Sequence, residues 1–236
     1  VSLVDGSGFI FRAYYALPPL TNEKGIPVGA VLGFCNMLFK LLADKKQGKI
    51  IVVFDSARKT FRNKIFPEYK SNRGSPPDDL IPQFKMIRDA VDAFGVTQVE
   101  LEGYEADDLI ATYANIFTKE NWEIEIISSD KDLMQLVNDK VRMMDPIKNK
   151  TIGRNEVYEK FGVYPEKVID VQSLAGDSVD NVPGAPGIGI KTASALINEF
   201  GDLESIKENA SSIKGVVGEN LRNSLNDLDH LRPYIY

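Results

Sequence analysis

Residues 50–56 read IIVVFDS, a short apolar run, mostly β-branched, that ends on an acid. The same pattern occurs in VSLVDG at residues 1–6 and in IEIISSDKD at residues 124–132, and a fourth apolar run spans residues 141–144. Between these runs, residues 28–42, 80–94 and 105–117 carry apolar side chains at helical spacing. Strands that alternate with helices predict an α/β fold with a mainly parallel sheet covered by helices on both faces.

Acids follow three of the predicted strands. In an open parallel sheet, ligands bind beyond the carboxyl ends of the strands, so these acids should share one edge. Any one acid after a strand is ordinarily a turn or helix-cap residue. Three such cases weaken the turn-or-cap interpretation but do not exclude it. A helix start, GYEADD, adds three acids, and LAGDSVDN adds two at i, i+3 spacing. The nine acids are Asp5, Asp55, Glu105, Asp107, Asp108, Asp130, Asp132, Asp177 and Asp180.

So many carboxylates in one place would repel one another, and divalent cations would relieve that repulsion. Zinc lacks suitable ligands, because the lone histidine, His230, lies far along the chain and Cys35 sits in a predicted helix. Oxygen ligands suit Mg²⁺ or Mn²⁺. Enough acids for two ions indicate phosphoryl-transfer chemistry, with hydrolysis of a phosphodiester by an activated water.

The net charge of −6 argues against a nucleic-acid partner, but the sign of the charge varies along the chain. Residues 58–73 carry six basic residues against one acid, and residues 59–79 contain three prolines and no sustained apolar face. A loop of this length is functional or disordered more often than not. A glycine-rich turn at residues 184–189 opens a predicted helix at Lys191 and Thr192, where backbone N–H groups can hold a phosphate. No apolar run approaches the ~18 residues that cross a bilayer, so a cytoplasmic protein without membrane contact is expected.

Six motifs occur in an order typical of one family. They are VDGSGFIFRAYYA, VVFDSARKTFR, PEYKSNR, GYEADD, SSDKDLMQLV and LAGDSVDNVPGAPGIGIKTA. This series resembles the 5′-nuclease family, which includes the N-terminal 5′→3′ exonuclease domain of bacterial DNA polymerase I, phage 5′-nucleases and flap endonucleases. The resemblance runs from Val1 to about Leu203. The family's first strand usually follows several more residues, so Val1 suggests a trimmed chain.

The resemblance implies roles for the acids. Asp5, Asp55, Glu105, Asp107 and Asp108 match the family's ligands of a first metal ion. Asp130, Asp132, Asp177 and Asp180 match those of a second, with Asp107 between the two.

The resemblance also implies DNA contacts. Arg62, Tyr69 and Lys70 match catalytic positions at the scissile phosphate, and Arg12 and Arg73 match positions that guide the 5′ strand. Gly184, Gly187, Gly189, Lys191 and Thr192 match a helix–hairpin–helix that grips duplex DNA, often with K⁺ at the hairpin carbonyls.

The implied organisation is a PIN-like or resolvase-like core at residues 1–150 with a helical arch at 59–82. A helical part at 151–236 would carry the helix–hairpin–helix at about 166–201. The expected substrate is a 5′-flap, nicked or RNA-primed DNA duplex, cut by a monomer in a bacterial cytoplasm near the nucleoid, with a polymerase domain in the same natural chain a further possibility.

Two other functions compete with this interpretation. One is a DNA-structure-binding module without catalysis. The other is a small-molecule phosphatase, which needs a second acid two residues after the first-strand Asp; Ser7 occupies that position here.

Overall fold

The computed structural model describes residues 1–44, 48–56 and 59–235, without the side chains of residues 226, 227 and 229–235. Arg58 of the basic stretch, Tyr236 of the expected helical part and the His230 side chain therefore lie outside the described part. The chain forms two compact units. The first contains Val1–Thr60, Ser75–Leu133 and Asp139–Thr151, and the second contains Phe61–Gly74, Met134–Asn138 and Ile152–Tyr236.

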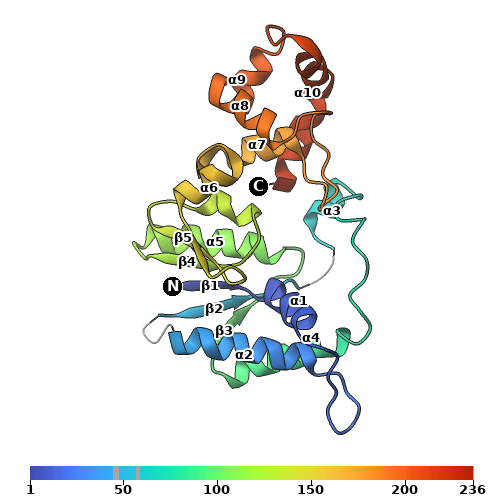
Figure 1. Cartoon of the computed structure of the whole chain (residues 1–236), viewed down its shortest axis with the longest axis vertical. Coiled ribbons are helices and arrows are strands. Elements are labelled where there is room, and N and C mark those ends of the chain that lie inside the picture. The colour runs from blue at the N-terminus through green and yellow to red at the C-terminus, as the bar shows by residue number, and fades with distance from the viewer. Residues whose placement is uncertain (45–47, 57–58, 236) are drawn as a thin grey trace. The chain divides into compact units, whose positions relative to one another are not determined.

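A six-stranded sheet forms the centre of the first unit (Figure 1). Its strands are β1 (Ser2–Asp5), β2 (Ile50–Val53), β3 (Thr97–Val99), β4 (Ile124–Ile127), β5 (Val141–Asp145) and β6 (Lys150–Ile152). The spatial order is β3-β2-β1-β4-β5-β6, and the pairs from β3 to β5 are all parallel. The turn at residues 146–149 is too short for a crossover, so β6 returns antiparallel to β5.

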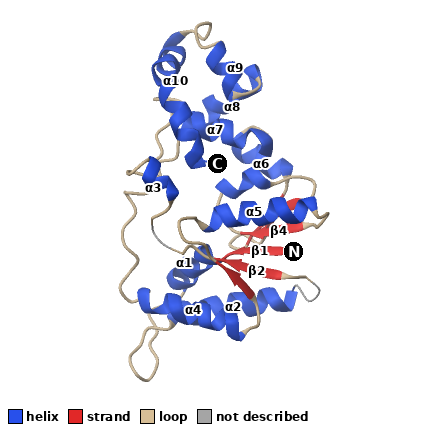
Figure 2. Cartoon of the chain, turned by 180° about the vertical axis from the view of Figure 1, so that it is seen from behind, coloured by secondary structure: helices blue, strands red, loops and turns tan. Residues whose placement is uncertain are grey.

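Helices cover both faces of this sheet (Figure 2). Helices α1 (Gly6–Ala16), α2 (Gly29–Asp44) and α4 (Ile81–Ala93) pack together on one face, and α5 (Ala106–Lys119) packs on β1, β2 and β4 from the other. The expected α/β class is confirmed. The strands predicted from the apolar runs at residues 1–4, 50–54, 124–127 and 141–144, and the three predicted helices, all lie within two residues of their expected limits. Helix α1 and strands β3 and β6 were not predicted.

The core on the α1–α2–α4 face is built around three phenylalanines. Phe34 of α2 is fully buried, stacks on Phe54 at 6.1 Å between ring centroids, and meets the ring of Phe9 edge-on at 6.1 Å. Aliphatic side chains from β1, β2 and α4 complete this cluster, including Val4, Val52, Ile87 and Val91. The packing fixes α1 and α2 against the sheet and thereby holds the junction between β1 and α1, where Asp5 lies.

The second unit is helical apart from its connecting segments. It contains α3 (Phe61–Ile65), most of the 3₁₀ turn η1 (Asp132–Leu136), α6 (Arg154–Phe161), η2 (Pro165–Lys167), α7 (Val168–Ala175), α8 (Ile190–Phe200), α9 (Leu203–Glu208) and α10 (Gly215–Ile235). Helices α7 and α8 pack on each other across a glycine-containing hairpin, and α10 packs on α7. The hairpin-linked pair of helices that the expected fold requires is therefore present.

The expected arch segment contains little helix. Of residues 59–82, all described, only Phe61–Ile65 and the first two residues of α4 are helical. Turns occupy residues 67–72, and Lys70 adopts a left-handed backbone with φ of 53°. Among the described residues, no helix has the length and hydrophobicity that a membrane span requires.

Replacing Phe34 by alanine should lower the free energy of unfolding by about 3–5 kcal/mol, because a fully enclosed ring leaves a cavity. The matched control is Phe39→Ala on the same helix, whose side chain is 65% exposed and whose loss should cost less than about 0.5 kcal/mol. Urea denaturation followed by circular dichroism measures both, and similar costs for the two variants would contradict the assigned core.

Candidate active site

Three adjacent strands deliver acids to the carboxyl edge of the sheet. Asp5 ends β1 and is in register with Val53, the last residue of β2, so Asp55 lies just beyond the same edge. Strand β4 pairs with β1 up to Ile127, three residues before Asp130. The strand order changes direction between β1 and β4, because β2 and β3 lie on one side and β4 to β6 on the other. Such a switch point is where open α/β sheets bind their ligands.

The Asp5 side chain caps helix α1. Its Oδ1 accepts a hydrogen bond from the Gly8 N–H at 2.7 Å, and its Oδ2 accepts one from the Ser128 hydroxyl at 2.8 Å. A Cβ atom on residue 8 would lie 2.4 Å from Asp5 Oδ2, so only glycine permits this close approach. Ser128 also accepts from the Asp130 N–H at 3.0 Å and thereby links the ends of β1 and β4.

Burial raises the pKa of Asp5 to about 6. The hydrogen bonds from Gly8 and Ser128 oppose this shift, and the negative charges of Asp55 and Asp130 add to it. The negative charges of Asp55 and Asp130 thus lie close enough to Asp5 to disfavour its ionisation. An ionised Asp5 is destabilising unless a cation compensates its charge.

Asp55 and the acids of GYEADD organise the start of α5. Asp55 Oδ1 accepts from the Ala106 N–H at 2.7 Å, and Asp108 Oδ2 accepts from the Glu105 N–H at 2.8 Å as half of a capping box. Glu105 is buried and Asp107 is half-buried. The positive end of α5 lowers the cost of placing several acids there.

Two further residues hold the main chain of Asp55. Its N–H donates to the Ser7 hydroxyl at 3.1 Å, and its carbonyl accepts from the Arg88 guanidinium at 3.0 Å. On the β4 side, Asp130 Oδ1 accepts from the Asp132 N–H at 2.9 Å and starts η1. Ser7, Arg88 and Ser128 were absent from the sequence prediction, although the adjacency of Ser128 to the acids in SSDKD is a signal that could have identified it.

Three of the predicted phosphate-contacting residues cluster in the second unit around Asp180. Tyr69 donates its hydroxyl to the Asp180 carboxylate at 3.3 Å, Lys70 Nζ lies 3.6 Å from it, and Arg73 forms an ion pair with it. Asp177 shapes the same turn, since its Oδ1 accepts from the Val179 N–H at 2.8 Å.

Arg12 and Arg62 lie in different environments. The Arg62 guanidinium stacks over the rings of Phe61 and Tyr69, and only 4% of the residue is exposed. Arg12 lies half-buried on α1 in the first unit.

The hairpin glycines differ in their physical roles. A Cβ on Gly184 would lie 2.3–2.5 Å from the backbone of residues 174–176, so this glycine allows two chain segments to touch. Gly187 has φ of 72°, a conformation that other residues rarely adopt. Gly189, at the N-cap of α8, has open space where a Cβ would lie. Only Gly189, with the exposed Lys191 and half-buried Thr192 after it, therefore leaves room for a phosphate at the helix N-terminus.

The donor chemistry of the acid edge suits a hard divalent cation, because every candidate ligand is a carboxylate oxygen. Within the described residues, however, no three His, Cys, Asp or Glu side chains are grouped closely enough to hold an ion. Asp5, Asp55 and Asp130 each direct an oxygen to a backbone N–H instead. Reorientation of these side chains would accompany metal binding.

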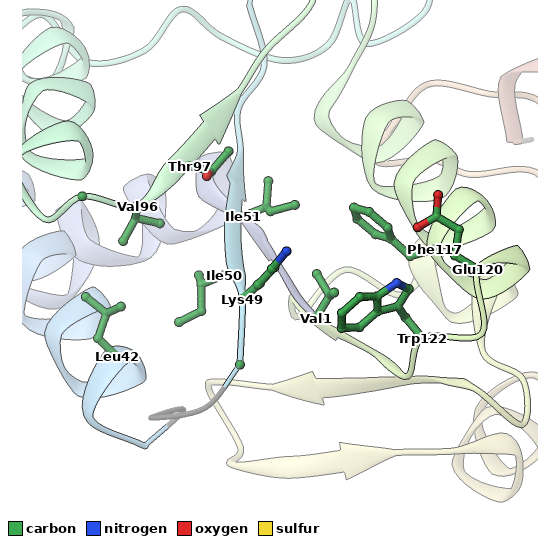
Figure 3. A pocket seen from close by; sticks show the side chains of 12 residues that line it. Val1, Leu42, Lys49, Ile50, Ile51, Val96, Thr97, Phe117, Glu120 and Trp122 are labelled. Atoms are coloured by element: carbon green, nitrogen blue, oxygen red, sulfur yellow. The ribbon is translucent and has the colours of Figure 1, made fainter.

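A pocket of about 600 Å³ lies at the opposite, amino edge of the sheet (Figure 3). Val1, Lys49 and Thr97 line it at the beginnings of β1, β2 and β3, and the Lys49 ammonium lies 5.7 Å from the centre of the Trp122 ring. Its wall contains one acid, Glu120, and none of the nine predicted acids. This pocket is therefore not the candidate active site, which lies at the carboxyl edge of the sheet.

Two protein-family models together match residues 1–233 of the chain. The family model described as the 5′-3′ exonuclease N-terminal resolvase-like domain matches residues 1–162, and that for the C-terminal SAM fold matches residues 163–233. The chain belongs to the 5′-3′ exonuclease family. The expected family is thereby confirmed.

Individual relatives agree with this assignment. The chain is 42% identical to the 5′-3′ exonuclease of Aquifex aeolicus over 207 residues, covering 88% of this chain and 72% of that protein. It is 55% identical to DNA polymerase I of Rhizobium leguminosarum over 222 residues, which are 91% of this chain but only 22% of that protein. A T5 5′-exonuclease structure with bound divalent metal ions (zinc) is similar with a TM-score of 0.83 at 25% identity, covering 100% of this chain and 88% of that one.

Asp5→Asn should stabilise the metal-free protein at pH 7.5. The folded pKa of about 6 exceeds the ordinary value of 3.8, so the wild type loses stability as pH rises from about 4 through 6. Asparagine is an equally good helix cap and carries no charge, so the variant should gain up to about 3 kcal/mol over wild type at pH 7.5 and nothing at pH 3.5. Urea titrations in EDTA at both pH values measure the difference, and added Mg²⁺ should reduce it. Equal stability of the variant and the wild type at pH 7.5 would show that the folded protein does not raise the pKa of Asp5.

Proposed function

We propose that this chain is a divalent-metal-dependent 5′-nuclease that hydrolyses phosphodiester bonds at 5′ ends, flaps or nicks of duplex DNA, including RNA-primed strands. The observation that carries the proposal is the convergence of Asp5, Asp55 and Asp130 at the switch point of a sheet whose family is established. The T5 5′-exonuclease, similar over the whole chain, is a metal-binding relative and supports a metal requirement here.

The acids would hold two ions, Mg²⁺ or Mn²⁺. Two such ions supply an activated water and neutralise charge on the phosphate. The proposed ligands of the first are Asp5, Asp55, Glu105, Asp107 and Asp108, with Asp107 also reaching the second. Asp130 and Asp132 would bind the second, and Asp177 and Asp180 are proposed for it on the strength of their family motif alone.

The other predicted site residues would position and retain the DNA substrate. Lys70 and Arg73 would bind phosphates of the 5′ strand, with Tyr69 and Arg62 supporting the turn that carries them. Arg12 on α1 would contact the same strand. Gly189, Lys191 and Thr192 would hold the duplex backbone at the start of α8, with K⁺ as a candidate ligand of the hairpin carbonyls.

The same proposal covers the domains of the natural chain and its place in the cell. The chain spans 22% and 26% of two DNA polymerase I relatives that it matches, which supports a polymerase domain in the same natural chain. We place a core domain at residues 1–150, with its arch at 59–82, and a helical DNA-binding part at 151–236, acting as a monomer in the bacterial cytoplasm near the nucleoid.

The role of Ser7 in the structure argues against the phosphatase alternative. In that mechanism a second acid two residues after the nucleophilic Asp would transfer a proton. Here Ser7 is a helix residue whose hydroxyl accepts from the Asp55 N–H.

The decisive experiment is cleavage of a 5′-labelled flap duplex, with a 3′ flap and a blunt duplex alongside. Cuts near the 5′ junction should require Mg²⁺ and spare the 3′ flap. Asp107→Ala should lower kcat by more than about a hundredfold, because even residues that only support a metal ligand contribute about ten- to a hundredfold. Asp89→Ala, which removes an exposed acid from α4, is the control and should cut normally. Tight flap binding without metal-dependent cleavage would favour the non-catalytic binding module.

Salt dependence tests the proposed phosphate contacts. In Ca²⁺, the double variant Lys70→Ala, Arg73→Ala should weaken flap binding and reduce the slope of log K against log salt by about 2, since each phosphate contact releases roughly one counterion. The control double variant, Lys85→Ala, Lys148→Ala, removes two exposed lysines of the first unit and should leave the slope unchanged. Fluorescence anisotropy at several salt concentrations gives both slopes, and an unaltered slope in the first variant would remove these residues from the interface.

A further inference from the structure

A single loop, residues 176–189, joins α7 to α8 and is fixed in both of its halves. Asp177 and Val182 exchange two backbone hydrogen bonds of 2.8 Å, which close a turn in the first half. In the second half, the Pro186 carbonyl accepts a hydrogen bond of 2.8 Å from the Asn220 amide of α10. The loop is thus held in place before it reaches the N-terminus of α8, which is the proposed contact for duplex DNA.

The basic segment at residues 66–73 lies along the first half of this loop, within the same unit. The Asn181 amide donates to the Glu68 carbonyl at 2.8 Å, and the Asn72 amide donates to the Ser178 carbonyl at 3.0 Å. Each asparagine therefore reaches from one chain segment to the main chain of the other. Because both acceptors are main-chain carbonyls, these two bonds fix the path of the basic segment itself.

Main-chain and apolar contacts complete the interface between the segment and the loop. The Lys70 N–H donates to the Asp180 carbonyl at 2.9 Å. Phe66 packs against Tyr69 and Val182, each of which is only 4% exposed. The segment is thus ordered by contacts within the protein, and this order does not require DNA.

The same interface holds the two cations that are proposed to bind the 5′ strand. The Lys70 ammonium lies 3.6 Å from the Asp180 carboxylate, and the Arg73 guanidinium forms an ion pair with the same carboxylate. Asp180 thereby keeps the two cations side by side. The Arg73 side chain is still 47% exposed, so a phosphate can approach it from solvent.

We propose that Asn72 and Asn181 are positioning residues that lock the 5′-strand segment to the loop of the duplex-binding helix. This inference rests on the proposed function, in which Lys70 and Arg73 bind the single-stranded flap and the start of α8 binds the duplex. Two contacts on one rigid support bind a two-armed ligand at a high effective concentration, whereas a loose segment must be ordered at the moment of binding. The lock thus makes a flap junction a better ligand than a duplex alone, and neither asparagine needs to touch DNA.

The sharpest variant is Asn181→Gly. Residue 181 has φ of 57°, which glycine adopts without strain, so the change removes the amide and keeps the turn. Asn149→Gly makes the same substitution at φ of 49° in the turn before β6, in the first unit, and is the matched control. Neither change alters the net charge of the protein.

The first test requires no DNA. Hydrogen exchange of a peptide that covers residues 66–73 should be about three- to tenfold faster in Asn181→Gly than in the wild type, the range that one lost hydrogen bond represents. Asn149→Gly should leave this exchange unchanged. Equal exchange in Asn181→Gly and the wild type would overturn the lock.

The second test compares binding of a 5′-flap duplex and of a blunt duplex by fluorescence anisotropy in Ca²⁺. Asn181→Gly should weaken flap binding about three- to tenfold and leave blunt-duplex binding unchanged, because the start of α8 is not altered. The slope of log K against log salt for the flap should keep its wild-type value, since Lys70 and Arg73 still reach the phosphates in the complex. Asn149→Gly should change none of these quantities.

The outcomes separate the lock from the proposed function. Equal weakening for both ligands, unchanged flap binding, or a smaller salt slope would overturn the lock while Mg²⁺-dependent flap cleavage by the wild type stands. Asn72 is exposed, so Asn72→Ala serves if Asn181→Gly does not fold, and it must give the same flap-selective loss. Absence of Mg²⁺-dependent cleavage by the wild type would overturn the proposed function itself.

Discussion

The burial of Asp5 beside the charges of Asp55 and Asp130 is the constraint on which the active-site edge depends. A parallel sheet brings the ends of neighbouring strands together, so Asp5, Asp55 and Asp130 meet because their strands are adjacent. The metal-free fold tolerates this by giving each acid a backbone donor, from Gly8, Ala106 and Asp132 respectively. Two of these donors lie in the first turns of α1 and α5, where the helix dipole favours negative charge. The same arrangement leaves the acids poised for a cation.

Much of this edge was predictable because strand ends are visible in sequence. An apolar run that stops at an acid specifies both the strand and the position of the acid on the sheet, as for Asp5 and Asp55. The unpredicted elements lack such a pattern. Helix α1 has two glycines among its first three residues and depends on the Asp5 cap and on packing of Phe9 against α2, while β3 and β6 are three residues long and largely polar. Their formation depends on neighbouring strands rather than on local sequence.

The side-chain partners of the acids were harder to foresee. Ser128 touches Asp5 across 123 residues, and Arg88 reaches the Asp55 carbonyl from α4. Such contacts depend on register and helix rotation, which composition and spacing do not encode. Arg62 illustrates the converse case: a basic residue in a basic stretch suggests an exposed phosphate ligand, yet its guanidinium is enclosed by two aromatic rings. Charge patterning identified the segment without ranking the residues inside it.

The use of backbone donors by the acids has a genetic consequence. A change from Asp to Asn at residue 5 or 55 keeps a side-chain oxygen for the helix N-terminus, whereas a change to Ala or Val removes a cap worth about 1 kcal/mol. The first kind of allele would yield a folded protein that occupies DNA ends without processing them, and the second a protein more readily cleared by cellular proteases. Two missense alleles of the same codon would then differ in dominance, although both remove the same proposed metal ligand.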